Sequence, residues 1–233
     1  MALTIRKLLW LPLIVSFEVL LVTLYAVSVH LNGGEPFPLL DVNGYRTLPS
    51  WFQAIQLFLM GAIPFWMYCT YPSPPSQNLQ VPPSRNLLVF TALLFFYASM
   101  DELFKFNILF GQHQLWKGIY LSLGLAVPIL FRRDLLRLWR LSPKAMRSIG
   151  IGIVTFVAGG FGLDLFRVYV QQPYWYQLFG QWQFYQVDSI RTAFEELAEM
   201  LGETLVISGM LGLMRQRRIQ FFIESRVGSG HKG

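Results

Sequence analysis

The chain has 233 residues, of which 54% are hydrophobic and only 14% are charged, whereas soluble domains carry about 25% charged residues, so the composition predicts lipid as the solvent. A single cysteine, Cys69, excludes an internal disulfide framework, and three scattered histidines (His30, His113 and His231) argue against a bis-histidine haem or a histidine-rich metal centre. The formal net charge of +6 could indicate nucleic acid, but the distribution of the basic residues indicates membrane topology instead, and we expect no nucleic-acid partner.

Six apolar segments approach or exceed the roughly 20 residues that a membrane-spanning helix needs. In chain order they are Leu8–His30, Trp51–Thr70, Asn86–Phe110, Trp116–Phe131, Ser148–Val170 and Ala193–Met214. The fourth is the shortest, and Pro128 near its end could kink or end its helix. We therefore predict an all-α polytopic membrane protein with six transmembrane helices, in which residues 1–233 form a single membrane domain.

The first segment has to be weighed against a cleaved signal peptide, because it follows Arg6 and Lys7. The tripeptide Ala26-Val27-Ser28 loosely resembles a cleavage site. However, the apolar run is longer than the signal-peptide core of about 7–15 residues. We therefore expect a retained membrane anchor.

The basic residues indicate which face of the membrane is the cytosol. In a six-helix arrangement most of the 19 Lys and Arg residues fall on one face: at the N-terminus, at Arg85, in residues 132–147 and at the C-terminus. An odd number of helices would split these basic clusters between two faces. We therefore predict that both termini are cytosolic (N-in/C-in) and that the protein lies in the cell (inner) membrane.

Three connecting segments differ in character. Residues 71–84 (YPSPPSQNLQVPPS) are typical of an extended cytosolic connector. Residues 132–147 place leucines and Trp139 among arginines, which predicts an interfacial helix that anchors the topology, with sensing of anionic lipid as the alternative. Gln171–Val187 is packed with Trp, Tyr and Gln, and we expect a loop at the outer interface.

Small residues in the last two segments predict close helix packing. Gly159, Gly160 and Gly162 lie in the fifth segment and Gly202 lies in the sixth. Small side chains let helix backbones approach one another inside a membrane.

Acidic residues are concentrated in the apolar segments, where charges are costly. Those in the segments, out of 13 in the chain, are Glu18, Asp101, Glu102, Asp164, Glu195, Glu196, Glu199 and Glu203. In the predicted orientation, the third, fifth and sixth helices bring carboxyl groups to a similar depth near the outer face. Glu196, Glu199 and Glu203 follow the i, i+3, i+7 spacing of one helix face.

Two basic residues can neutralise only part of this cluster. Lys105 follows Asp101 by four positions, and Arg167 follows Asp164 by three. The excess of acids implies protonated carboxyl groups, a bound cation or water entering from outside. The candidate ion or proton ligands are Asp101, Glu102, Asp164, Glu196, Glu199 and Glu203, with Lys105 and Arg167 as charge-balancing residues.

Two further acids have other predicted roles. Thr192 and Glu195 have the spacing of a capping box that opens the sixth helix, where the positive helix N-terminus would also favour Glu196. Glu18 is the lone acid of the first segment, and it could stay silently protonated or extend a proton path inward from Glu203.

Two motifs resemble a group of uncharacterised bacterial multi-pass membrane proteins. They are Asp101-Glu102 in the third segment, and Glu195-Glu196 followed by Glu199 and Gly202 in the sixth. That group carries an Asp-Glu…His-Glu helix and a later Glu-Glu…Glu-x-x-Gly helix. The His-Glu positions fall on Asn107 and Ile108 here, so any metal ligands at those positions are missing. The resemblance covers these two helices only, supports the acidic cluster and implies no particular activity.

Three functions fit these observations. The first is a cation or proton site in a transporter or channel, since carboxylates suit H⁺ and divalent cations such as Ca²⁺, Mg²⁺ or Mn²⁺, and a homo-oligomer would supply the size that the chain lacks. The second is an accessory or assembly subunit, whose acids pair with partner membrane proteins. The third, an intramembrane enzyme, is disfavoured because no histidine lies near the cluster, so we predict no catalytic residues.

Overall fold

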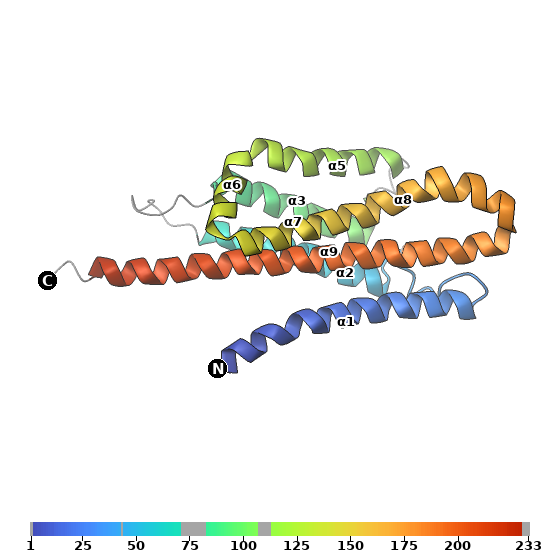
Figure 1. Ribbon diagram of the computed structural model, residues 1–233, viewed down its shortest axis with the longest axis horizontal. Coiled ribbons are helices and arrows are strands. Elements are labelled where there is room, and N and C mark those ends of the chain that lie inside the picture. Colours follow the sequence, from blue (N-terminus) through green and yellow to red (C-terminus); the bar gives the residue numbers. More distant parts are fainter. Residues whose placement is uncertain (1, 43, 71–82, 107–112, 230–233) are drawn as a thin grey trace.

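The computed structural model describes residues 2–42, 44–70, 83–106 and 113–229, and every regular element in these ranges is a helix. The helices run back and forth along one long axis, and both termini lie at the same end of the molecule (Figure 1). The predicted all-α fold is confirmed for this part of the chain. In chain order the elements are α1 (Ala2–Leu31), α2 (Leu48–Cys69), α3 (Arg85–Phe104), α5 (His113–Leu130), α6 (Arg132–Leu141), α7 (Pro143–Val157), η1 (Ala158–Gly162), α8 (Leu163–Phe166), η2 (Arg167–Trp175) and α9 (Tyr176–Ser229).

Five helical stretches of the described residues are long and apolar enough to cross a membrane. They are Trp10–Leu31, Leu48–Cys69, Arg85–Phe104, Pro143–Gln171 and Val187–Gln216. The fourth predicted segment forms a helix, α5, but it is not among these five, so six spans and the N-in/C-in orientation stay a prediction. The end of the third segment, residues 107–110, and residues 71–82 of the connector lie outside the described residues.

The start of α2 shows how the sequence sets a helix boundary. Thr47 is the N-cap residue, and its side chain accepts a hydrogen bond from the backbone N–H of Ser50. The Ser50 hydroxyl accepts one from the backbone N–H of Thr47 in return, and Pro49 fits the first turn because it has no N–H to satisfy. These contacts fix where α2 begins, and with it the depth of Gln53 and Gln56.

Two predicted connecting segments were wrong in their extent or structure. The helix predicted over residues 132–147 ends at Leu141, as α6, because Ser142 adopts φ −146° and ψ 80° ahead of Pro143, and proline disfavours a helical residue before it. Gln171–Val187 is helical, within η2 and α9, and is not a loop. Trp, Tyr and Gln do not break a helix, and a helix satisfies backbone groups near a membrane.

Three clusters of buried apolar side chains hold the bundle together. The first joins α1 to α9 around Leu21, Tyr25 and Met200. The second joins α2 and α3 to α9 through residues such as Leu57 and Val206. The third joins α3, α6, α7 and α9. Since α9 takes part in every cluster, it is the central helix of the bundle.

The backbones of α7 and α9 approach each other closely at two glycines. A Cβ added at Gly152 would lie 2.6 Å from the carbonyl oxygen of Gly202, and one added at Gly202 would lie 2.7 Å from the carbonyl oxygen of Gly152. Real Cβ atoms do not approach oxygen so closely, so the two backbones can touch only because both residues are glycine. The predicted packing role of Gly202 is therefore confirmed.

Many large apolar side chains remain exposed along the helices, including Ile151, Val154 and Leu165 on α7 and α8. A soluble protein would have to hide such a surface, whereas lipid accepts it. The exposed faces suggest a lipid environment for the bundle.

Candidate functional site

Glu18 lies in a buried group of polar side chains where α1, α2 and α9 meet. The Gln56 amide nitrogen donates to Glu18 Oε1 at 2.8 Å and to Thr204 Oγ1 at 2.7 Å. The Thr204 hydroxyl donates to the same Glu18 oxygen at 2.5 Å. The side chain of Glu18 is 0% exposed, and its Oε2 atom has no hydrogen-bond partner. An acid from α1 is thus held by neutral groups of two other helices.

Glu203 lies beside this group, next to Thr204 in the chain, and is 1% exposed. Its Oε2 atom has no hydrogen-bond partner. The main charges that act on it are those of Glu199, Glu102, Glu18 and Glu196. We refer to Glu18, Gln56, Thr204 and Glu203 as the polar core.

Glu199 is positioned by a glycine of the neighbouring helix. Its Oε2 atom lies 3.5 Å from the amide nitrogen of Gln53, on α2. Its Oε1 atom lies directly over Gly160 of η1, in the space where any side chain at that position would begin. Gly160 therefore makes room for the Glu199 carboxyl group, in addition to the packing role that the sequence predicted.

Asp101 and Glu102 lie at the end of α3, close to the row of acids that Glu196, Glu199 and Glu203 form on α9. Lys105 Nζ pairs with Glu102 Oε1 at 2.5 Å, a pair that the sequence did not predict. Lys105 follows the last residue of α3 in a left-handed conformation (φ 45°), so the helical spacing no longer applies to its side chain. The charges of Glu196 and Glu199 also act on Lys105, which places this cation beside the acids of α9.

A second group of charges, which we call the arginine network, links η2 to α9. Arg191, which is buried, pairs with Asp188 at 3.0 Å and with Glu195. Arg167 Nε lies 3.5 Å from the same Asp188 carboxylate. The network therefore holds two half-buried carboxylates beside guanidinium groups.

The predicted capping box of Thr192 and Glu195 was wrong. Since α9 begins at Tyr176 and continues through this region, neither residue lies at a helix start. Glu195 instead pairs with Arg191, one turn earlier, and Glu196 has no helix N-terminus beside it.

The structure brings most, but not all, of the predicted site residues together. Glu102, Lys105, Glu196, Glu199, Glu203 and Glu18 act on one another electrostatically. Asp101, on α3, and Asp164, on α8, are half-buried and are not among the main charges acting on Glu196 or Glu203. Within the described ranges, no three His, Cys, Asp or Glu side chains gather closely enough to hold a metal ion.

Sequence analysis missed the neutral members of the site: Gln53, Gln56 and Thr204. All are buried. Gln53 and Gln56 are three positions apart in an apolar span, which places both amides on one helix face. This spacing could have identified a polar face on the second apolar segment. It was missed because only charged residues were counted there.

Comparisons with known proteins identify a family and no activity. No curated protein and no solved structure matches the chain. A family described as "Domain of unknown function (DUF8692)" matches residues 12–213, which includes the whole polar core and the arginine network. Because this match covers most of the chain, the protein belongs to that family.

Proposed function

We propose that this membrane protein binds and exchanges protons at the polar core, as one step in moving protons across the bilayer. The observation that carries the proposal is the burial of Glu18 and Glu203 without a counter-charge. Both acids are almost completely buried, and no Lys or Arg of the described residues forms an ion pair with either.

The electrostatic cost favours a neutral acid at this site. An isolated carboxylate that is removed from water costs several kcal/mol, and a buried acid without a counter-charge avoids this cost by holding a proton. Gln56 and Thr204 supply hydrogen bonds without supplying charge. The Oε2 atoms of Glu18 and Glu203 have no hydrogen-bond partner, so no donor there offsets a negative charge, which favours the neutral acid.

The neighbouring acids offer a route for the proton. Glu196, Glu199 and Glu203 lie on successive turns of α9, and the charge of Glu18, on α1, acts on Glu203. Glu102 and Lys105 of α3 flank the same route. In the predicted orientation, the proton enters from the outer face past Glu196 and reaches Glu203 and Glu18 deeper in the bilayer.

Protons fit this site better than a divalent cation does. Ca²⁺ and Mg²⁺ require about six or more oxygen ligands, usually with several carboxylates among them. The described residues offer no such convergence. A metal-free proton site also needs no large cavity, because a proton can pass between adjacent carboxyl groups.

Proton movement can be measured on the full chain in liposomes that contain a trapped pH-sensitive dye. A membrane potential, negative inside, should drive acidification of the interior. We expect Glu203→Gln and Glu18→Gln to reduce the rate to that of empty liposomes. Glu35→Gln is the matched control, because Glu35 is exposed and lies outside the polar core.

Infrared difference spectroscopy gives an independent readout of the proton itself. The carbonyl stretch of a protonated carboxylic acid should change with pH in the unaltered protein, weaken in Glu203→Gln and disappear in the double variant Glu18→Gln/Glu203→Gln. Unchanged proton flux in the double variant Glu18→Gln/Glu203→Gln would overturn the proposal. Stabilisation of the protein by Ca²⁺, Mg²⁺ or Mn²⁺ that depends on Glu203 would favour a cation site instead.

A further inference from the structure

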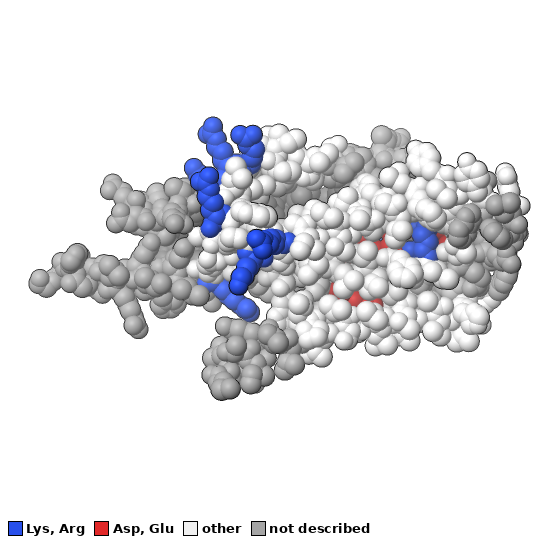
Figure 2. Space-filling model, in the orientation of Figure 1, with Lys and Arg blue, Asp and Glu red and all other residues white. Residues whose placement is uncertain are grey.

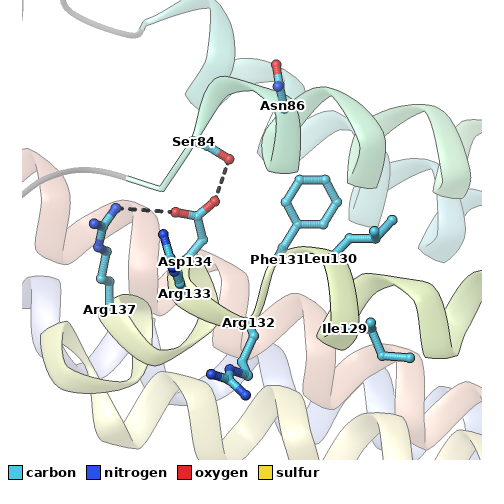
Figure 3. A pocket seen from close by; sticks show the side chains of 9 residues that line it. All are labelled: Ser84, Asn86, Ile129, Leu130, Phe131, Arg132, Arg133, Asp134 and Arg137. Atoms are coloured by element: carbon cyan, nitrogen blue, oxygen red, sulfur yellow. Dashed lines mark hydrogen bonds and ion pairs between the residues drawn. The ribbon is translucent and has the colours of Figure 1, made fainter.

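A cavity of about 550 Å³ lies far from the polar core, where α5 ends and where α3 and α6 begin. Figure 3 shows its lining, which includes Ser84 from the start of α3 and a run of residues from Ile129 to Arg137. It belongs to the end of the molecule at which the Lys and Arg side chains gather (Figure 2). No part of the proposed proton route uses this cavity.

The cavity contains more positive than negative charge. Arg132, Arg133 and Arg137 line it together with one acid, Asp134. Asp134 accepts a hydrogen bond from the Ser84 hydroxyl at 2.5 Å and lies 3.7 Å from an Arg137 nitrogen (Figure 3). Neither Arg132 nor Arg133 forms an ion pair with a carboxylate of the described residues. The excess charge therefore suits an anionic ligand.

The backbone adds to this preference for an anion. The first turn of α6 has no side-chain cap, so its N–H groups remain available as donors. The positive end of the α6 dipole faces the same space. Arginine side chains beside a helix N-terminus are a favourable arrangement for a phosphate group.

Apolar side chains beside the arginines indicate where such a phosphate would come from. Ile129 and Leu130, the last residues of α5, line the cavity and are 74% and 69% exposed. Leu136 and Trp139 of α6 are also about half exposed. A soluble phosphate would gain nothing from these side chains, whereas an acyl chain would cover them.

We propose that this cavity binds an anionic phospholipid, with its phosphate on Arg133, Arg137 and the first turn of α6, and an acyl chain along Ile129 and Leu130. Arg137 can turn from Asp134 to the phosphate, because their ion pair is long and Ser84 still holds Asp134. Figure 3 shows Arg132 extending away from the Ser84–Asp134 pair, so we assign it to the edge of the site.

Native mass spectrometry of the delipidated full chain tests the proposal. The probes are phosphatidylglycerol, which is anionic, and phosphatidylcholine, which has no net charge. We expect selective retention of phosphatidylglycerol and about fivefold weaker binding in Arg133→Gln, since one basic residue near an anionic surface contributes about 1 kcal/mol. Arg140→Gln is the matched control, because Arg140 is exposed on α6 but does not line the cavity.

A second variant and a soluble anion separate the remaining outcomes. Leu130→Ser should weaken phosphatidylglycerol binding while the helical content by circular dichroism stays unchanged. Three results would overturn the proposal: equal retention of the two lipids, equal losses in Arg133→Gln and Arg140→Gln, or displacement of the lipid by inorganic phosphate at similar concentrations. The last result would assign the cavity to a soluble phosphate compound.

Discussion

The polar core and the arginine network hold acidic side chains in two different ways. In the network, Asp188 and Glu195 share the guanidinium group of Arg191. In the polar core, Glu18 has an amide and a hydroxyl as partners, and Glu203 has an unpartnered oxygen atom. The first arrangement supplies a counter-charge to its carboxylates, whereas the second supplies hydrogen bonds to Glu18 but no counter-charge. Four substitutions test this difference, from the largest expected effect to the smallest.

Arg191→Met should destabilise the protein most, by about 3 kcal/mol, because it leaves two half-buried carboxylates without their shared, buried cation. Arg167 still faces Asp188, which keeps the loss at the lower end of the range for broken buried ion pairs. Thermal unfolding in detergent measures the effect. Arg191→Lys is the control that retains the charge, and equal stability of all three proteins would show that the network is not structural.

Gln56→Leu should cost about 2 kcal/mol, because it removes the donor to Glu18 and Thr204 and leaves their buried oxygens less satisfied. The same unfolding experiment measures it. Gln216→Leu is a control of similar chemistry, since Gln216 donates to the backbone oxygen of Leu141 at the other end of α9. A larger loss in the control would mean that the polar core contributes little to the bundle.

Gly159→Ala should cost about 1 kcal/mol, because the new Cβ would lie 2.6 Å from the Cβ of Ala198 while alanine partly compensates through its better helix propensity. Gly160→Ala meets only the movable end of Glu199, so its cost should be smaller. Gly162→Ala has open space around it and serves as the control. Comparing the denaturation midpoints of the three variants ranks the contacts, and equal midpoints would contradict this packing.

Glu18→Gln should have the smallest effect, below about 1 kcal/mol, because a protonated acid and an amide have nearly the same shape and hydrogen-bonding groups. Glu195→Gln, measured beside it, should cost more, since it weakens a pair with the buried Arg191. If the Glu18 variant lost more stability than the Glu195 variant, Glu18 would be held as an anion and the contrast between the two regions would be wrong.

The sequence predicted the parts of the fold that depend on long apolar runs and regular spacing. The helical spans, the stripe of Glu196, Glu199 and Glu203, and the close approach at Gly202 all follow from periodicity and residue size. What failed depended on where helices start and stop. Thr192 and Glu195 have the spacing of a capping box, but this local motif does not reveal that α9 begins earlier, at Tyr176, and continues through both residues.

Ion-pair partners were harder to predict than helix faces. Residue spacing placed Lys105 one turn after Asp101 but did not predict its pair with Glu102, which forms where the left-handed Lys105 follows α3. Asp188 was not among the predicted site residues, because it lies between the expected loop Gln171–Val187 and the sixth apolar segment, which begins at Ala193. Such pairs depend on the exact ends of helices and on tertiary contacts, which residue spacing alone does not specify.

The reciprocal contact between Gly152 and Gly202 also constrains how the bundle can move. A slide or rotation of α7 against α9 would drive a side chain into the facing backbone. We therefore expect these two helices to move together as one rigid unit. α1 joins α9 through ordinary side-chain packing and the hydrogen bond between Glu18 and Thr204. We therefore expect α1 to be the tilting element that exposes the buried acid first to one side of the bilayer and then to the other.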